Sequence, residues 1–222
     1  MSLHWQAARP PGRTALDGDL VRLEPVDVER HGRDLHAAQA GAPEIWEYLP
    51  DGPFQSEHEF LEWLRASAAS ADPLFYAIVD RVSGKPLGMA SYLRITPKHG
   101  VIEVGYIWYS PALQRTRQAT EAMYVMARHV FDELGYRRYE WKCNALNEPS
   151  RRAALRLGFT YEGVFRQHMV VKDRNRDTAW YSMLDTEWPA AKAAFEAWLR
   201  PDNFDAAGRQ RKSLAELRQA GS

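Results

Sequence analysis

Residues 101–122 read VIEVGYIWYSPALQRTRQATEA and join two elements of different periodicity. Residues 101–109 are largely apolar and aromatic and follow a turn at 98–100, which predicts a strand. From residue 119 onward apolar side chains recur every three or four positions until Gly135, which predicts a long amphipathic helix. Such a strand-to-helix junction gathers free backbone N–H groups at the positive end of a helix dipole, where an anion binds well. The apolar positions of the helix are Ala119, Ala122, Met123, Met126, Ala127, Val130, Phe131 and Leu134.

The residues on the N-terminal side of this stretch predict an antiparallel meander with two helices. A strand at 20–25 is stopped by its proline, and an aspartate can cap a helix over 27–40. A capping box at 56–59 opens a second helix. Strands at 75–80 and 86–94 then follow, joined by a turn that contains a glycine.

The residues on the C-terminal side alternate strand and helix and then form a hairpin. A short strand precedes a helix that an asparagine opens and a glycine ends. Two further strands flank a highly charged turn, and a last helix follows. In order, these elements are the strand 139–143, the helix 147–158, the strands 160–171 and 178–184 around the turn 172–177, and the helix 188–200.

The order of elements, β, α, α, β, β, β, α, β, α, β, β, predicts a mixed α/β fold of the α+β type. We expect a single domain with a central, mostly antiparallel sheet, one parallel pair that flanks the long helix, helices on the faces and a C-terminal helical extension. We place an N-terminal extension, flexible or draped over the surface, at 1–18, the domain at 19–187, and a C-terminal helix and tail at 188–222. The tail is expected either to wrap the body or to stay loose.

The charge and hydropathy of the chain exclude several classes of protein. The 222 residues carry 29 basic and 29 acidic side chains, so the formal net charge is zero. Proteins that neutralise phosphates on nucleic acid usually carry a basic surplus, so we expect no nucleic-acid partner. No apolar run reaches the ~20 residues that span a bilayer, and the N-terminus lacks the apolar core of a signal peptide. We therefore expect a cytoplasmic protein that binds no membrane.

The cysteine and histidine content bears on the cellular compartment and on metal binding. The single cysteine, Cys143, excludes an intramolecular disulfide and favours a reducing compartment. It lies in an apolar strand and is expected to be inert. The seven histidines show no HExxH or paired spacing, so we expect no metal site.

Three short motifs, in order along the chain, carry a resemblance to a known family. They are Gly105-Tyr106 followed by Gln114-Arg115-Thr116-Arg117-Gln118-Ala119-Thr120-Glu121-Ala122, then Asn147-Glu148-Pro149-Ser150, then Leu157-Gly158-Phe159. From about Val21 to Leu184 the sequence resembles the GNAT superfamily of N-acetyltransferases, in particular the branch of the RimJ and RimL ribosomal-protein N-terminal acetyltransferases. The resemblance implies an acyltransferase that takes an acetyl group from acetyl-coenzyme A, its cosubstrate, and passes it to a primary amine.

The resemblance also implies where the cosubstrate binds. The loop and first helical turn would hold the pyrophosphate, and Asn147 would hydrogen-bond the pantetheine arm. Backbone N–H groups near Trp108 and Tyr109 would face the thioester oxygen, a contact worth ~3 kcal/mol in comparable sites. We expect the side chains of these two residues to pack in the core instead. The full set of expected contacts is Trp108, Tyr109, Gln114, Arg115, Thr116, Arg117, Gln118, Ala119, Thr120, Asn147, Ser150 and Arg152.

Several arginines are expected to lie near the phosphates of the cosubstrate. Arg117 departs from the family pattern, which has a glycine there so that the backbone can approach the pyrophosphate. The arginine could grip the phosphates through a bidentate contact, which we favour, or it could obstruct the loop. Arg151, Arg152 and Arg156 lie on the helix that should flank the cosubstrate. One of them could meet its 3′-phosphate, and the alternative is a solvated helix face.

The implied reaction needs a neutral amine, a donor for the developing oxyanion and a proton for the departing thiolate. At pH 7 an α-amine with a pKa of ~7.7 to 8.0 is about a tenth neutral, whereas a lysine near ~10.4 is almost wholly charged. Glu103, a lone carboxylate in an apolar strand, is the candidate base, acting through water; the alternative is a charge on a solvent-facing strand position. Ser150 is the candidate proton donor by resemblance, because many family members place a tyrosine where this chain has Ala154. Its alternative role is capping the helix with Asn147.

We expect the acceptor to be the N-terminal α-amine of a protein. A small-molecule acetyltransferase for a polyamine, amino acid or antibiotic remains an alternative, as does a non-catalytic acyl-coenzyme A binder, which the residues at 117 and 154 suggest. The last helix, with its aromatic residues, could cover the sheet or meet a second subunit in a homodimer. Cations of the last hairpin suggest an acidic acceptor, against the simpler interpretation of a polar hairpin tip: Arg166, His168, Lys172, Arg174 and Arg176.

Overall fold

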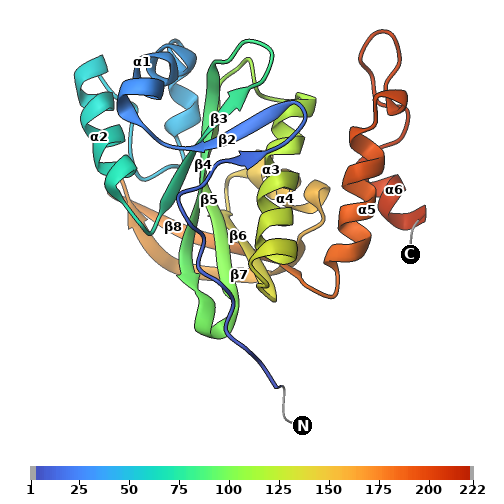
Figure 1. The fold of residues 1–222 in the computed structure, drawn as a ribbon. Coiled ribbons are helices and arrows are strands. Elements are labelled where there is room, and N and C mark those ends of the chain that lie inside the picture. The colour runs from blue at the N-terminus through green and yellow to red at the C-terminus, as the bar shows by residue number, and fades with distance from the viewer. Residues whose placement is uncertain (1–3, 221–222) are drawn as a thin grey trace.

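The computed structural model describes residues 4–220, which form one eight-stranded sheet with helices on both faces (Figure 1). The strands lie in the order β1-β2-β3-β4-β5-β6-β8-β7, and every neighbouring pair is antiparallel except β5 and β6. The predicted mixed α/β fold with one parallel pair is confirmed. The bounds are β1 Leu16–Asp17, β2 Val21–Pro25, β3 Leu74–Asp80, β4 Pro86–Thr96, β5 Val101–Tyr109, β6 Arg138–Asn144, β7 Thr160–Val171 and β8 Arg174–Leu184.

The parallel pairing of β5 with β6 is short. It comprises four residue pairs, the last of which joins Val104 to Trp141. Beyond that point β5 continues along β4 alone, with an irregular register and with Tyr106 in the left-handed region at φ 49°. β6 continues along β8. The two strands therefore diverge and leave an opening in the middle of the sheet.

Four helices cover the two faces of the sheet, two on each. α1 and α2 lie on one face, and α3 and α4 lie on the other (Figure 1). Successive residues of β3 point to opposite faces, so Tyr76 packs in the core under α3 and Phe75 packs in the core under α1 and α2. No helix within residues 4–220 is long and apolar enough to cross a membrane. The bounds are α1 Val28–Gln39, α2 Glu57–Ala69, α3 Arg117–Arg128 and α4 Glu148–Leu157.

The predicted caps set where these helices begin. Asp27, Ser56 and Asn147 each accept a hydrogen bond from a backbone N–H three residues further on. Thr116 does the same for α3, so this helix begins two residues before the first predicted apolar position. Apolar periodicity misses that first turn because its first two residues, Arg117 and Gln118, are polar.

The long helix does not run uninterrupted to residue 134. Regular α-helix ends at Arg128, and the next turn, His129–Glu133, is a π-helix. The N–H of Leu134 accordingly bonds to the carbonyl of His129, five residues back. Gly135 closes the element at φ 76°, where its lack of a side chain permits the left-handed conformation.

The last hairpin has a tighter turn than predicted. Only Lys172 and Asp173 form it, both with positive φ (50° and 57°), and β8 begins at Arg174 instead of residue 178. Two left-handed residues suit a two-residue turn whose twist matches that of the strands. Residues 174–177, three of which are charged, are therefore part of a strand, where alternate side chains point to opposite faces of the sheet.

Both ends of the chain pack on the body. From residue 4 onward the N-terminal segment lies on the surface, which is one of the two arrangements considered for it; the N–H of Ala8 bonds to the carbonyl of Pro97, and regular structure begins already at Leu16 in β1. The C-terminal helices α5 Trp188–Leu199 and α6 Leu214–Ala220 wrap the body. Of the two positions predicted for the last helix, covering the sheet is not observed, because α5 packs on the outer side of α3 (Figure 1).

We predict that Gly88, on β4, is needed for the close approach of β5. A Cβ at this position would lie 2.5 Å from the carbonyl oxygen of Trp108 and 3.1 Å from the side chain of Leu113. Gly88→Ala should lower the free energy of unfolding by about 1–3 kcal/mol, because the backbone must shift. Urea unfolding followed by circular dichroism measures this loss. Gly12→Ala is the control, since a Cβ at Gly12 has nothing within 4 Å, and equal stability of the two variants would contradict the prediction.

Candidate functional site

The opening between β5 and β6 belongs to one cleft of about 1460 Å³. This is larger than the ~300–1,000 Å³ of a pocket for one small ligand, so the cleft has room for two reactants. Its helix end is lined by residues of the β5–α3 loop, α3 and α4: Gln114, Arg115, Thr116, Arg117, Ala119, Thr120, Asn147, Ser150, Arg152 and Arg156. Its hairpin end is lined by residues of the strands and of the 3-10 turn η1 Pro43–Trp46 with the segment after it: Tyr48, Arg94, Glu103, Lys142, His168, Arg176 and Thr178.

The start of α3 provides backbone donors at the helix end. The Thr116 hydroxyl accepts a hydrogen bond from the N–H of Ala119 at 3.1 Å. The N–H groups of Arg117 and Gln118 are in the first turn, so no carbonyl of the helix itself is available to them. These donors and the helix dipole together favour a negatively charged group at this point.

The Arg117 side chain is directed toward the C-terminal segment. Its guanidinium donates to the carbonyl of Leu199 at 2.6 Å and lies 4.4 Å from the centroid of the Phe204 ring. One of its donors is therefore already used, so the bidentate phosphate contact that the sequence suggested is not available in this conformation. Its Nε is buried without a hydrogen-bond partner and remains as a donor at the helix end.

The C-terminal segment forms a wall of the helix end that the sequence did not predict. Trp198, Phe204 and Gln210 line the cleft there. Arg156 lies 4.9 Å from the centroid of the Trp198 ring and donates to the hydroxyl of Thr120 at 3.1 Å. The only sequence signal for this wall was the aromatic content of the residues after 188, which does not say where the segment packs.

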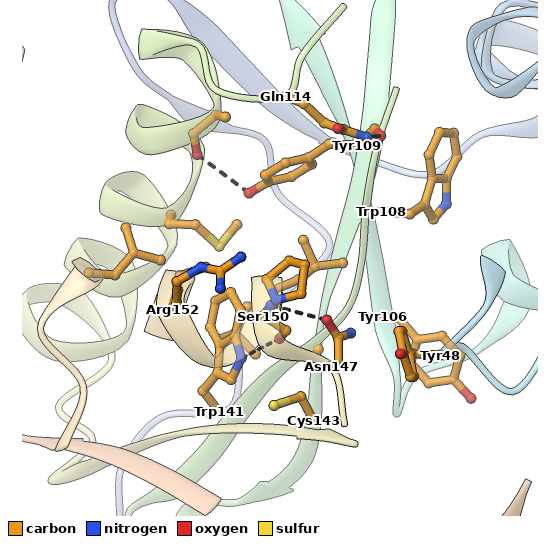
Figure 2. Close-up of a pocket in the computed structure, with 18 of the residues that line it drawn as sticks. Tyr48, Tyr106, Trp108, Tyr109, Gln114, Trp141, Cys143, Asn147, Ser150 and Arg152 are labelled. Atoms are coloured by element: carbon orange, nitrogen blue, oxygen red, sulfur yellow. Dashed lines mark hydrogen bonds between the residues drawn. The ribbon is translucent and has the colours of Figure 1, made fainter. Parts of the chain in front are cut away.

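The middle of the cleft lies between β6 and α4. Ser150 Oγ accepts a hydrogen bond from the indole N–H of Trp141 at 3.0 Å, and the Ser150 N–H donates to the Asn147 side chain at 3.1 Å. Figure 2 shows Trp141 and Ser150 on one side of the cleft and Tyr106 on the other. Burial raises the pKa of the nearby Cys143 thiol. Ser150 thus both takes part in the helix cap and presents its hydroxyl to the cleft.

Of the other predicted contacts, one does not line the cleft. The Trp108 indole is buried in the core under α1 and α2, as expected for its side chain. The Tyr109 hydroxyl donates to the Ala119 carbonyl at 3.4 Å, and Gln114 donates to the Tyr109 carbonyl at 3.0 Å. Gln118 is the exception among the predicted contacts, because its side chain donates to Asp80 at 3.5 Å and does not line the cleft.

The three arginines of α4 differ in whether they line the cleft. Arg152 lines the cleft and pairs with Glu148 at 3.2 Å, and it is seen beside Ser150 in Figure 2. Arg156 lines the cleft as well. Arg151 instead turns away, with its Nε donating to the Tyr181 hydroxyl at 3.2 Å.

Glu103 is buried, at 6 % exposure, where β5 and β6 begin to diverge. The alternative of a solvent-facing charge is therefore wrong. Its carboxylate forms an ion pair with the Lys142 ammonium and lies 3.6 Å from the Arg94 guanidinium. Burial raises the pKa of Glu103, and the charge of Lys142 opposes that rise. Burial also lowers the pKa of Lys142, which the sequence did not single out.

The cations of the last hairpin have different environments. His168 and Arg176 line the cleft, and His168 bonds to the Thr178 hydroxyl at 2.9 Å. Lys172 donates to the carbonyl of Trp46 at 2.7 Å and so joins the hairpin to η1. Arg166 and Arg174 are exposed and do not line the cleft. Within residues 4–220, no three His, Cys, Asp or Glu side chains lie together in the way a metal ion requires.

Comparisons with known proteins agree with this geometry. Residues 21–160 match the acetyltransferase (GNAT) domain family. A GCN5-related N-acetyltransferase from Brucella melitensis is 50% identical, with a TM-score of 0.95, and the match covers 97% of this chain and 99% of that one. A probable acetyltransferase of the GNAT family from Chromobacterium violaceum ATCC 12472 is 44% identical, with a TM-score of 0.80, over 85% of this chain and 95% of that one.

A curated relative matches over a shorter stretch. The ribosomal-protein-serine acetyltransferase of Escherichia coli (strain K12) is 30% identical over 98 residues, which are 44% of this chain and 54% of that protein. The chain spans less than two thirds of the length of the curated relatives it matches.

We predict that Arg117 anchors the C-terminal wall. Arg117→Met should lower the free energy of unfolding by about 1–3 kcal/mol, because it removes a charged hydrogen bond to Leu199 and a contact with the Phe204 ring. It should also speed proteolytic cleavage after residue 200. Urea unfolding and limited proteolysis measure the two effects, with the exposed Arg115→Met as the matched control. Identical cleavage rates in both variants would show that Arg117 does not hold the segment.

Proposed function

The chain belongs to the GNAT acetyltransferase family, and on that premise we propose that it transfers an acetyl group from acetyl-coenzyme A to the N-terminal α-amine of a protein. The observation that carries the proposal is the cleft through the sheet. It joins the N-terminus of α3, with its free backbone donors, at one end to a buried carboxylate, Glu103, at the other.

The residues at the helix end fit coenzyme A. The backbone donors of Arg117 and Gln118, with the buried unpartnered Nε of Arg117, suit its pyrophosphate. Arg152 and Arg156 supply further positive charge, and Asn147 would hold the pantetheine arm. The bound cosubstrate supplies an acetyl thioester.

Two residues of the cleft would handle the protons. Glu103 takes a proton from the acceptor amine, through water, so that the nitrogen lone pair is free to bond to the acetyl carbon. Ser150 gives a proton to the sulfur as the carbon–sulfur bond breaks, and backbone N–H groups near Trp108 and Tyr109 face the acetyl oxygen. The burial that raises the pKa of Glu103 makes it a stronger base than an ordinary carboxylate.

The choice of an N-terminal α-amine rests on chemistry and on one relative. An α-amine is partly neutral at pH 7, so a buried carboxylate is a sufficient base. A lysine amine is almost wholly protonated at pH 7 and needs a much stronger base. The Escherichia coli relative that matches part of this chain is a ribosomal-protein-serine acetyltransferase. A protein terminus is accordingly our preferred acceptor, and a small amine is the second candidate.

An assay of free thiol tests the proposal. The protein is mixed with acetyl-coenzyme A and a panel of N-terminal peptides, ε-amine peptides and small amines, and thiol release is followed by a colorimetric reagent. We expect release with the N-terminal peptides and an added acetyl mass on them. Release with small amines alone would favour the second candidate. Binding of acetyl-coenzyme A without release from any acceptor would mean a non-catalytic binder.

We predict that Glu103→Gln reduces turnover at neutral pH by ~10² to 10⁴-fold, because the amide cannot take up the amine proton. The affinity for coenzyme A should stay nearly unchanged, since Glu103 lies away from the helix end. Steady-state kinetics and calorimetric titration with coenzyme A measure the two quantities. Glu44→Gln is the matched control, because Glu44 is exposed at the rim of the same cleft. Unchanged turnover across pH would remove Glu103 as the base.

The ion pair with Lys142 gives a pH prediction. The ammonium favours the charged carboxylate, so Lys142→Met should raise the pKa of Glu103 further. The base is then protonated over a wider range, and the acidic limb of the kcat/KM profile should move to higher pH. The exposed Lys98→Met is the control and should leave the profile in place. A limb that stays put or moves to lower pH in Lys142→Met would contradict the assignment.

A further inference from the structure

Arg176 lies in the cleft because the turn of the β7–β8 hairpin is so short. β8 begins at Arg174, directly after the two-residue turn, and Arg176 pairs with Met169 on β7. Both residues line the hairpin end of the cleft. Arg176 is therefore a strand residue of the acceptor side and not part of a polar hairpin tip.

The guanidinium of Arg176 has no partner within residues 4–220. Its Nε is buried and makes no hydrogen bond, and no ion pair involves it. Other arginines of the cleft are engaged, since Arg117 bonds to a carbonyl and Arg152 pairs with Glu148. Burial lowers the pKa of Arg176, but a guanidinium stays charged at neutral pH. A buried donor on a charged group is costly unless something bonds to it.

The charges at the hairpin end do not balance. Glu103 is the carboxylate that acts on Arg176, and it is already shared between Lys142 and Arg94. Lys142, Arg94 and Arg176 thus lie around Glu103, while the other buried carboxylate near Lys142, Glu140 at 3.8 Å, is paired with Arg138. This arrangement leaves positive charge available for an anion that enters from outside.

The cations of the hairpin end also act on the imidazole of His168. Desolvation lowers the pKa of His168, and the charges of Lys142, Arg176 and Arg94 lower it further. The acidic side chains that line this part of the cleft, Glu44 and Glu47, are exposed on the η1 segment, where water screens them.

We propose that Arg176 binds a carboxylate of the acceptor, so that the preferred acceptors are amines with an acidic group close to the acetylated nitrogen. The inference rests on the proposed acetyl transfer and specifies its substrate. Arg176 lies near enough to Glu103 to feel its charge, so one molecule can place its amine at Glu103 and its carboxylate at Arg176. The planar guanidinium can bond both oxygens of a carboxylate at once.

The unbalanced positive charge also helps the chemistry. A nearby cation disfavours an ammonium group and lowers its pKa, so the acceptor nitrogen loses its proton more easily. An acceptor that carries its own carboxylate still enters readily, because its negative charge meets Arg176. An amine without such a group meets the same positive potential with nothing to offset it.

Matched acceptors test the proposal. One arm compares N-terminal peptides that differ only by Asp or Asn, or by Glu or Gln, at the second and third positions. A second arm compares β-alanine with β-alaninamide. The enzymes are the wild type, Arg176→Gln, Arg176→Lys and the exposed hairpin control Arg174→Gln. The readouts are kcat/KM for each acceptor and the affinity for coenzyme A.

We expect the wild type to prefer the carboxylate member of a pair, and Arg176→Gln to lower its kcat/KM by about 10- to 100-fold. The amide member and coenzyme A affinity should change less than about 2-fold, Arg174→Gln should resemble the wild type, and Arg176→Lys should fall between. A preference in the peptide arm identifies an acidic protein terminus, and one in the small-amine arm identifies an amino acid; both support the proposal.

Two results would overturn it. Equal acetylation of the members of every pair by the wild type refutes the role of Arg176 and leaves the acetyl transfer itself intact. Equal losses for both members in Arg176→Gln and Arg176→Lys, with coenzyme A affinity preserved, also refute it. Absence of thiol release with every acceptor tested would refute this inference together with the proposed function.

Discussion

The early end of the parallel pairing between β5 and β6 is the constraint on which the rest of this structure depends. After Val104 and Trp141 the two strands share no ladder, and the left-handed backbone at Tyr106 turns β5 away. A continuous sheet would have closed this space with backbone hydrogen bonds. That divergence creates the cleft. It also places the start of α3 at the helix end of the cleft and the buried Glu103 at the hairpin end.

The cleft has two ends with different electrostatics, although the chain as a whole has no net charge. The helix end offers backbone donors and arginines to a polyanion. The hairpin end instead gathers Arg94, Lys142 and Arg176 around the buried Glu103. Acidic residues offset these cations in the total charge, and some lie directly beside them, such as Glu148, which pairs with Arg152.

Local patterns predicted most of the fold and much of the site. Capping residues, apolar periodicity and the three motifs located the strands, the helices and the loop that ends at Thr116, because each depends on neighbours in the chain. The sequence failed where distant contacts decide. Arg117 bonds to a residue 82 positions away, and Lys142 gains its significance only from Glu103 on the adjacent strand. The short turn at Lys172 was missed because its flanking charges suggested a loop, although two left-handed residues suffice.

Neighbouring residues of β6 open the cleft to both faces of the sheet. Trp141 faces α4 and Lys142 faces the opposite side, toward Glu103 and β8. On the proposed function, acetyl-coenzyme A therefore enters from the face covered by α3 and α4, and the acceptor amine enters from the opposite face. The two meet at the plane of the sheet. Neither has to vacate the cleft before the other enters, so both substrates are bound together when the transfer occurs. The kinetic mechanism that suits such a passage is sequential, with initial-velocity lines that intersect instead of running parallel.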